Sequence, residues 1–376
     1  MIDSQRIELG QLTTTMNGLW TGKKPPFQTI AVIRNTNFSK DCRLKMDDVA
    51  MIEVESKQFA SRRLQYGDII IEKSGGSDKQ PVGRPVLFDI KEGEYSFSNF
   101  TAALRVNDRS IILPEYLQKF LYQFYLTGKT EQMQSKTTGL RNLDFNAYRK
   151  ILVPVPSIEA QKRIVSEIDL LSGIISKKNQ QVDDLHTLGF TFFHELFGDI
   201  VSNDKHWPSR IVGEICDMKA GKGIKASELS DEPHEGLYPC YGGNGIRGYI
   251  AKKSHDGLFP IVGRQGALCG NVNFAKGEFY ATEHAVVCKP SEVLDPYFLF
   301  YALTLMNLNQ YATGVAQPGL AVKSITPLPI VVPPIEIQRL FSEKVKGIER
   351  QLSMIERSIS DVSLLLGSRM ASFFSD

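Results

Sequence analysis

The chain has 376 residues, of which 42% are hydrophobic and 23% are charged, and its formal net charge is +2. This composition is typical of a globular protein with two or three domains and argues against a largely disordered chain. The sequence contains neither the ~18 to 20 uncharged apolar residues that a membrane helix requires nor the start of a secretory signal, so we expect a cytoplasmic protein that does not contact membranes.

Residues 1–155 are predicted to form a strand-rich globular region. Short β-branched or aromatic runs are separated there by Gly, Asp, Lys and Pro, which is typical of strands. These runs lie at residues 27–38, 66–76, 84–90 and 95–106. A helical stretch at 114–126 closes the region, and the whole pattern predicts an α+β fold.

A long helix is predicted next, over residues 156–199. Ser157 suits its N-cap, and Glu159 suits the positive end of its dipole. An apolar stripe follows in alternating steps of four and three, with breaks at Lys178 and Gly189. The stripe consists of Ile164, Ile168, Leu171, Ile175, Val182, Leu185, Phe192 and Leu196. It predicts a single helix of about 40 residues, roughly 60 Å long.

Residues 200–332 have the same character as the first region. Strand-like runs occupy 260–272, 277–290 and 327–334, and a helical stretch occupies 296–309. We therefore predict a second α+β domain.

The last segment, residues 333–376, is predicted to be a second long helix that copies the first. The motif Pro-x-Ile-Glu-x-Gln at 156–161 recurs at 333–338, and Pro334 suits the first turn of this helix. The matching stripe has one polar break, at Arg369, and consists of Phe341, Val345, Ile348, Leu352, Ile355, Ile359, Val362, Leu366 and Phe373. The chain is thus predicted to be a tandem duplication whose interiors have diverged.

The two stripes also predict how the helices pair. A long helix with a narrow apolar stripe must bury it against another helix, and the partner of equal length is the other copy. Because the second region separates the two helices along the chain, the second helix must run back along the first. We therefore predict an antiparallel pair with one globular domain at each end and a pseudo-two-fold axis between them.

The sequence shows no arrangement of residues that would make it an enzyme. The Gly-rich stretch 242–249 has no strand-loop-helix context and no following Lys-Ser/Thr, so a tight turn is the better interpretation. Glu283 and His284 are adjacent but have no recognisable nucleophile. The six histidines lack metal-ligand spacing, and the five cysteines form no CxxC pair, which favours reduced thiols. We expect no catalysis, no metal and no cofactor on this chain.

Both globular regions are rich in residues of the kind that contact nucleic acids. Arg reads guanine, Asn and Gln read adenine, and Lys and Gly-loop amides hold phosphates. In the first region the candidates are Arg34, Asn35, Asn37, Arg62, Arg63, Lys73, Ser74, Arg84, Lys136, Arg141 and Asn142. In the second they are Lys222, Lys225, Asn244, Arg247, Arg264, Gln265, Asn271, His284 and Gln317.

These features together resemble the specificity (S) subunit of type I restriction-modification systems. The resemblance covers nearly the whole chain and is carried by the two Pro-x-Ile-Glu-x-Gln helix starts and the Phe-Phe-His-Glu-Leu-Phe-Gly-Asp end at 192–199. In the second region it is carried by TyrGlyGlyAsnGlyIle at 241–246, ValGlyArgGlnGlyAla at 262–267, AlaThrGluHisAla at 281–285 and GlyValAlaGlnProGlyLeu at 314–320.

The resemblance implies a division of labour along the chain. Residues 1–155 and 200–332 would be two target recognition domains that each read half of a bipartite target in double-stranded DNA. Residues 156–199 and 333–376 would be the conserved spacer helices between them. The subunit would recruit two methyltransferase (M) subunits and, through the complex, restriction (R) subunits. S-adenosylmethionine, ATP and Mg would belong to those partners.

Two other functions fit parts of the sequence. One is a non-catalytic coiled-coil adaptor whose end domains bind proteins, which the small net charge favours. The other is a nuclease or methyltransferase with a disguised site. Binding to DNA with methyltransferase subunits present distinguishes the first from the specificity subunit, and an activity assay on the purified chain distinguishes the second.

Overall fold

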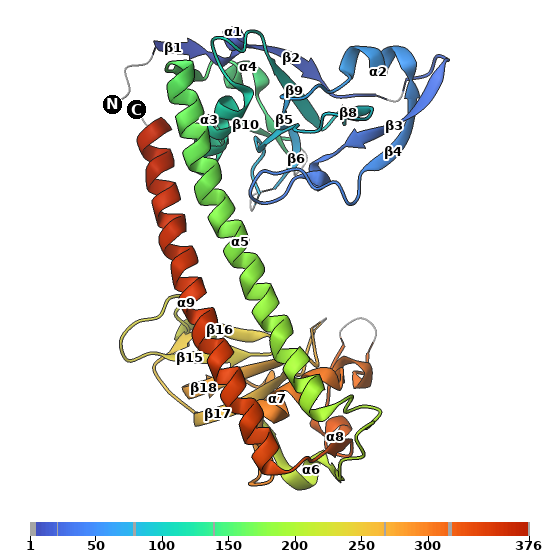
Figure 1. Cartoon of the computed structure of the whole chain (residues 1–376), viewed down its shortest axis with the longest axis vertical. Helices are drawn as coiled ribbons and strands as arrows, with labels where there is room; N and C mark the ends of the chain where they lie inside the picture. The colour runs from blue at the N-terminus through green and yellow to red at the C-terminus, as the bar shows by residue number, and fades with distance from the viewer. Residues whose placement is uncertain are drawn as a thin grey trace. The chain divides into compact units, whose positions relative to one another are not determined.

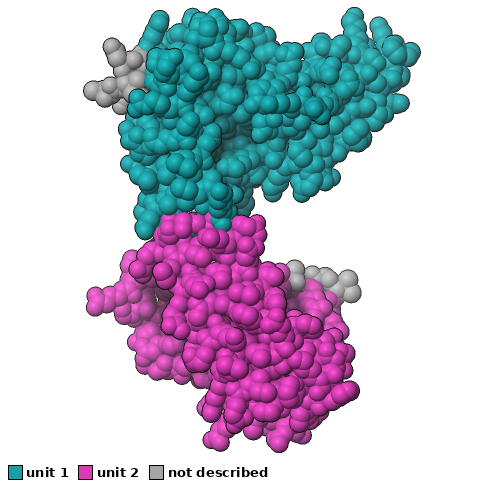
Figure 2. Space-filling model, in the orientation of Figure 1, with its two compact units in different colours: residues 1–177, 359–376 teal, residues 178–358 magenta. Residues whose placement is uncertain are grey.

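The computed structural model describes residues 5–20, 22–77, 80–137, 140–266, 268–314 and 318–374. The chain divides into two compact units, which Figure 2 shows in teal and magenta. Unit 1 contains residues 1–177 and 359–376, and unit 2 contains residues 178–358. Each unit therefore holds one globular region together with a part of both long helices, whereas the helices were predicted to be separate segments at residues 156–199 and 333–376.

The two long helices form as predicted. Helix α5 spans Ile158–Phe197 and helix α9 spans Ile335–Phe374, each with 40 residues. The Ser157 hydroxyl accepts a hydrogen bond from the Ala160 N–H at 3.3 Å, as an N-cap does. Pro334 lies just before α9 rather than in its first turn, and its carbonyl accepts hydrogen bonds from Ile337 and Gln338.

In the described ranges of unit 1 the strands form four sheets. The two-stranded sheet pairs β1 (Gln5–Glu8) with β12 (Leu152–Val155), and the four-stranded sheet has the order β2 (Thr13–Asn17), β9 (Thr101–Val106), β5 (Ile69–Glu72), β7 (Pro85–Leu87). The three-stranded sheets are β4 (Ala50–Glu55), β3 (Phe27–Ile33), β8 (Tyr95–Phe97), and β10 (Gln134–Thr137), β11 (Leu140–Leu143), β6 (Ser74–Gly76). The predicted strands 66–76 and 95–106 are each divided, because the chain passes there from one sheet to another.

Among the helices in the described part of unit 1, α3 (Pro114–Leu126) packs against both long helices. The others are α1 (Leu9–Leu12), α2 (Ser56–Arg62) and α4 (Phe145–Tyr148). Tyr116 and Phe120 of α3 share a core with Ile164 of α5 and Phe374 of α9. Arg369 of α9 also forms a two-pronged ion pair with Glu167 of α5. The end of α9 thus lies beside the start of α5 in this unit (Figure 1).

Unit 2 is built around a larger sheet. Its six strands have the order β14 (Cys216–Ala220), β19 (Ala285–Pro290), β17 (His255–Gly263), β18 (Val272–Ala281), β15 (Tyr238–Gly242), β16 (Gly245–Ile250). A separate pair joins β13 (Ser209–Ile211) to β20 (Pro329–Val331), and the short helices are α6 (Val212–Ile215), α7 (Pro296–Leu305) and α8 (Val322–Ile325). Helix α7 ends earlier than predicted because Asn307 adopts a left-handed backbone conformation, with φ at 48°.

An aromatic cluster fastens the long helices to unit 2. Phe193 and Phe197 of α5 pack against Phe298 of α7 and Phe341 of α9, and all four side chains are fully buried. The ring centroids of Phe193 and Phe341 lie 5.4 Å apart, in edge-to-face geometry. The end of α5 therefore lies beside the start of α9. Each unit by itself pairs one helix start with one helix end, which confirms the antiparallel prediction.

The apolar stripes are less deeply buried than predicted. Ile164, Ile168 and Leu171 of α5, and the matching Phe341, Val345 and Ile348 of α9, are buried. The other stripe residues are only half-buried: Ile175, Val182, Leu185, Phe192, Leu196, Leu352, Ile355, Ile359, Val362, Leu366 and Phe373. A single partner helix covers only one side of a stripe, so full burial requires a globular region as well. At the helix ends the buried positions shift to Phe193, Phe197, Met370 and Phe374, because they face the globular regions rather than the partner helix.

The glutamine of the repeated motif has the same structural role in both units. The Gln161 amide donates to the carbonyls of Ile111 and Pro156, each at 2.9 Å, and its oxygen accepts from the Leu113 N–H at 2.8 Å. Gln338 does the same with Val293, Pro333 and Asp295, at 3.0, 2.7 and 2.8 Å. Both glutamines are fully buried. The motif therefore clamps the start of each long helix to the loop that precedes α3 or α7.

All five cysteines are buried and free, as expected for reduced thiols. Burial raises the pKa of Cys42 to about 12, so its thiol stays protonated and unreactive at neutral pH. In the ranges that the structure describes, no helix is long and apolar enough to cross a membrane.

Candidate nucleic-acid interface

Four loops of unit 2 meet at one end of its six-stranded sheet. They are the segment after β14, the β15–β16 turn, the segment after β17 and the β18–β19 loop. Backbone hydrogen bonds join them: Arg264 N–H donates to the His284 carbonyl at 3.1 Å, Thr282 N–H to Tyr241 at 2.9 Å, and Lys222 N–H to Ala281 at 3.1 Å. The loops are therefore held by the fold and present their side chains together.

Two glycines allow these loops to cross closely. A Cβ atom on Gly221 would lie 2.0 Å from the Ala281 carbonyl oxygen, and one on Gly263 would lie 1.8 Å from the Gly243 oxygen. Real Cβ atoms do not approach an oxygen this closely, so only glycine fits at either position. The close approach of Gly263 to Gly243 joins the motif at 262–267 to the motif at 241–246 and requires the glycine at 263.

The loops gather most of the residues that the sequence singled out in this region. Lys222, Lys225, Asn244, Arg247, Gln265 and Asn271 are exposed, and Arg264 and His284 are half-buried. Within the described part of unit 2, the charged ends of Lys222, Arg247 and Arg264 have no acidic partner. Cations that no carboxylate neutralises are available to an anion such as a phosphate. Gln317 lies outside the described residues.

Other contacts in this cluster are polar and local. The Asn271 amide donates to the Asn244 side-chain oxygen at 3.1 Å, which links the segment after β17 to the β15–β16 turn. His284 Nε2 lies 3.3 Å from Glu283 Oε1. Glu283 was not predicted to contact DNA, since it stood out in the sequence only as the neighbour of His284.

Unit 1 has an equivalent set of loops, which the backbone hydrogen bonds identify. Lys73 N–H donates to the Phe100 carbonyl at 2.9 Å, as Arg264 does to His284, and Ser98 N–H donates to Ile33 at 2.9 Å, as Thr282 does to Tyr241. A Cβ on Gly18 would lie 1.8 Å from the Ser98 oxygen, and one on Gly221 would lie 2.7 Å from the oxygen of the corresponding Thr282. Lys73 therefore corresponds to Arg264, and Phe100 corresponds to His284.

Part of the first region's candidate set lies in this cluster. The Arg62 Nε donates to the Asn17 carbonyl at 3.2 Å, and the Lys73 ammonium donates to the Asn17 side-chain oxygen at 3.3 Å, so both cations lie beside Asn17. The Ser74 hydroxyl donates a hydrogen bond to the Asn142 side-chain oxygen, which links β6 to β11. Asn17 and Phe100 were not among the residues predicted to contact DNA.

Other candidates of the first region have partners within the protein. Arg84 and Glu72 form a buried ion pair with Nε and Oε2 2.6 Å apart, and Asn35 donates to Glu72 at 3.1 Å. Asn37 is buried and donates to the Asp48 carbonyl at 2.9 Å. Arg84, Asn35 and Asn37 therefore stabilise the fold, and the proposed interface does not include them.

Two further candidates of unit 1, Arg34 and Arg63, lie in long ion pairs. Arg34 lies 3.8 Å from Asp48, and Arg63 lies 3.9 Å from Glu94, and exposed pairs of this length contribute little to stability. The side chain of Arg141 is only 15% exposed, lies 3.8 Å from Glu131 and donates to the Gln134 side-chain oxygen at 3.3 Å. The side chain of Lys136 lies outside the described residues.

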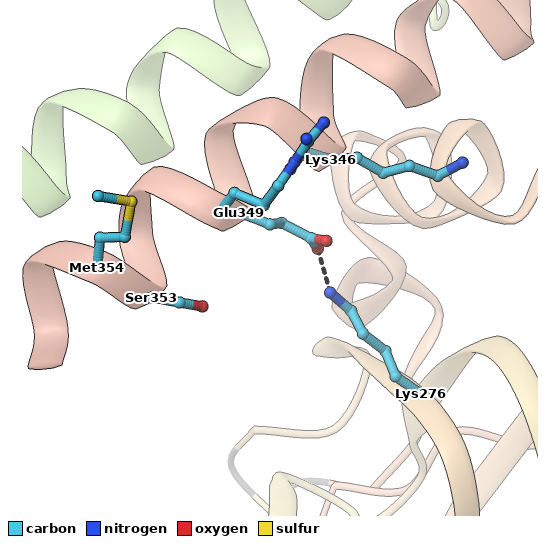
Figure 3. A pocket seen from close by; sticks show the side chains of 6 residues that line it. Lys276, Lys346, Glu349, Ser353 and Met354 are labelled. Atoms are coloured by element: carbon cyan, nitrogen blue, oxygen red, sulfur yellow. Dashed lines mark hydrogen bonds and ion pairs between the residues drawn. The ribbon is translucent and has the colours of Figure 1, made fainter.

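A separate depression in unit 2 has a structural role. It is lined by Lys276, Lys346, Glu349, Arg350, Ser353 and Met354 (Figure 3). Glu349 of α9 accepts from the Lys276 ammonium at 2.5 Å and from the Tyr297 hydroxyl at 2.8 Å. Burial and the neighbouring Glu349 carboxylate raise the pKa of Tyr297, so its hydroxyl remains a donor. This network ties strand β18 and helix α7 to α9. Among the described residues there is no group of His, Cys, Asp and Glu that would hold a metal ion.

Comparison with known proteins gives one family. The model of the type I restriction modification DNA specificity domain matches residues 12–184 and again residues 204–362. The type I restriction enzyme EcoprrI specificity subunit of Escherichia coli is 35% identical over 263 residues, which are 66% of this chain and 64% of that relative, so less than two thirds of its length is matched. The putative type I restriction enzyme MjaX specificity subunit of Methanocaldococcus jannaschii is 20% identical and covers 82% of this chain and 78% of that protein.

Solved structures show the same fold. The crystal structure of a type I restriction-modification S subunit from M. genitalium superposes with a TM-score of 0.61 at 15% identity, over 100% of this chain and 97% of that one. The two family matches fall on the two globular regions that carry equivalent loop clusters. The chain therefore belongs to the family of type I restriction-modification specificity subunits.

Proposed function

We propose that this specificity subunit reads a bipartite, gapped DNA sequence, with one half-site contacted by each unit. The observation that supports this most directly is the equivalence of the two loop clusters, which share backbone hydrogen bonds but carry different side chains. Arg264 and His284 in unit 2 correspond to Lys73 and Phe100 in unit 1. Two loop clusters with the same backbone arrangement and different side chains are suited to two different half-sites. The target should therefore be asymmetric.

We propose further that the chain acts within a complex in the cytoplasm. Two methyltransferase subunits would bind it, and restriction subunits would join through them. S-adenosylmethionine, ATP and Mg would be bound by these partners, which leaves this chain without cofactor or catalytic role. Apolar side chains on the outer faces of the long helices, among them Leu170, Leu188, Met354 and Leu364, support a role of these helices in assembly.

Arg264→Ala tests the interface in unit 2. If Arg264 reads a base, the substitution should cost ~1–3 kcal/mol of discrimination and relax one position of one half-site. The measurement is methylation mapping in cells that carry the variant with its methyltransferase subunit. Arg210→Ala is the control, since Arg210 is an exposed arginine of the same unit that lies away from the loop cluster, on β13. A uniform loss across all sequences would show a phosphate contact, and no loss would remove Arg264 from the interface.

Lengthening both helices tests their role as a spacer. One heptad inserted near Lys178 and another near Ile355 would extend the pair by ~10.5 Å and keep the stripes in phase. The gap in the methylated motif should then grow by about three base pairs, with weaker binding because ~100° of added duplex rotation must be absorbed. Sequencing of methylated DNA measures the gap. An assembled variant that still methylates the original spacing would refute the spacer role.

A further inference from the structure

The residue that precedes His284 and Phe100 occupies a defined place in each loop cluster. Since Thr282 and Ser98 donate the same backbone hydrogen bond, and His284 and Phe100 accept the same one, the residues between them correspond as well. These residues are Glu283 in unit 2 and Asn99 in unit 1. In each unit a single residue, His284 or Phe100, separates this position from an inner strand of the main sheet, β19 or β9.

The Glu283 carboxylate is partly exposed and lacks, within the described part of unit 2, the hydrogen bonds that a structural role would require. Its side chain is 44% exposed, and Oε1 lies 3.3 Å from His284 Nε2. Its Oε2 is covered and has no hydrogen-bond donor among the described residues. Gly223 lies beside this oxygen, since a Cβ on it would lie 3.5 Å away, in ordinary van der Waals contact. Glu283 Oε2 is therefore an acceptor in the loop cluster whose hydrogen bond is not satisfied by the described residues.

A carboxylate in a cluster that otherwise carries cations needs a specific reason to be there. It repels phosphates, so it weakens general affinity for DNA, and the neighbouring Lys222, Arg247 and Arg264 must offset that repulsion. What a carboxylate can do is accept a hydrogen bond from an exocyclic amino group of a base. In the major groove, adenine places the N7 acceptor beside its amino group, which repels a carboxylate, whereas cytosine presents its N4 amino group without such a neighbour. The chemistry thus favours cytosine.

The Asn99 side chain is suited to adenine rather than to cytosine. Its side chain makes no hydrogen bond to any described residue and is half-buried at the same place in unit 1. An amide both donates and accepts, which matches the N6 and N7 pair of adenine. The two units would then differ at this position in the base they select.

We propose that the position before His284 and Phe100 determines base specificity, with Glu283 selecting a cytosine in the half-site of unit 2 and Asn99 selecting an adenine in that of unit 1. The assignment rests on the proposed function, since it requires that the loop clusters contact DNA. It adds residues that read bases and the bases that they read.

The test compares methylated motifs of complexes that contain Glu283→Gln, Glu283→Asp or the parent chain, each with its methyltransferase subunit. Glu283→Gln should lower the preference for cytosine at one position of the unit 2 half-site by about 5- to 150-fold, the equivalent of ~1–3 kcal/mol, and leave the other half-site unchanged. Glu283→Asp should keep cytosine preferred with reduced activity. Asn99→Glu should shift one position of the other half-site from adenine toward cytosine.

Glu292→Gln is the matched control, because Glu292 is an exposed glutamate at the opposite end of the same strand, β19. The inference is overturned if Glu283→Gln leaves the motif unchanged, if it weakens all sequences equally, if Glu292→Gln alters the motif in the same way, or if the parent motif holds no cytosine in the unit 2 half-site. A parent complex that methylates without any gapped motif would instead overturn the proposed function, so the two failures are distinguishable.

Discussion

Gln338→Leu should lower the free energy of unfolding of unit 2 by about 3–6 kcal/mol. Leucine has a similar volume but neither donates nor accepts, so the Val293 and Pro333 carbonyls and the Asp295 N–H lose their partners in a site that water does not reach. Each buried polar group left unpaired costs ~1–3 kcal/mol. The loss also affects the start of α7, because the Asp295 carboxylate caps that helix through the N–H of Tyr297 at 2.8 Å.

Denaturant unfolding followed by tryptophan fluorescence measures this effect. The chain has two tryptophans, and Trp207 packs against the core of unit 2, so a Trp20→Phe background makes the signal specific to that unit. Gln351→Leu is the control, since Gln351 is an exposed glutamine of the same helix and should change stability by less than ~0.5 kcal/mol. Equal midpoints for the two variants would refute the clamp.

Arg84→Met should lower the free energy of unfolding of unit 1 by about 3–5 kcal/mol. The side chains of Arg84 and Glu72 are only 7% and 3% exposed, and removing the arginine leaves a buried carboxylate without its counter-charge. The guanidinium also donates to the Phe38 carbonyl at 3.3 Å and lies over the Phe38 ring at 5.6 Å from its centroid. The loss is therefore one of packing as well as of charge.

Thermal unfolding measures the loss of stability. Hydrogen exchange of the β5 amides, measured separately, shows whether the loss is in unit 1. Arg63→Met is the control, because Arg63 is half-exposed and its ion pair is long, so its removal should cost less than ~1 kcal/mol. The double variant Arg84→Met with Glu72→Gln should lose less than the sum of the two single losses, because it removes both charges. A stable Arg84→Met variant with altered base preference would return Arg84 to the DNA interface.

The long helices show what could be predicted from sequence alone. Their extent, their antiparallel pairing and their duplication follow from the spacing of apolar residues and from the order of segments along the chain. Arg264 and Gln265 were predicted from a Gly-rich motif, and the structure places them with His284 in one loop cluster, while their contact with DNA stays a prediction. In the sequence, Glu283 stood out only as the neighbour of His284, and its correspondence to Asn99 appears only when the backbone hydrogen bonds of the two units are compared.

The amino-acid sequence by itself determined the tandem architecture, because helical periodicity and repeated motifs are local properties that residues close in the chain express together. Only the tertiary structure decided which polar residues are buried and which face the solvent. Arg84 and Lys73 look alike as basic residues beside strands, yet Arg84 is enclosed by Glu72 and Phe38, whereas Lys73 reaches Asn17 at the surface. The environment of such a residue comes from segments distant in sequence, and its desolvation therefore follows from the packing of the whole unit.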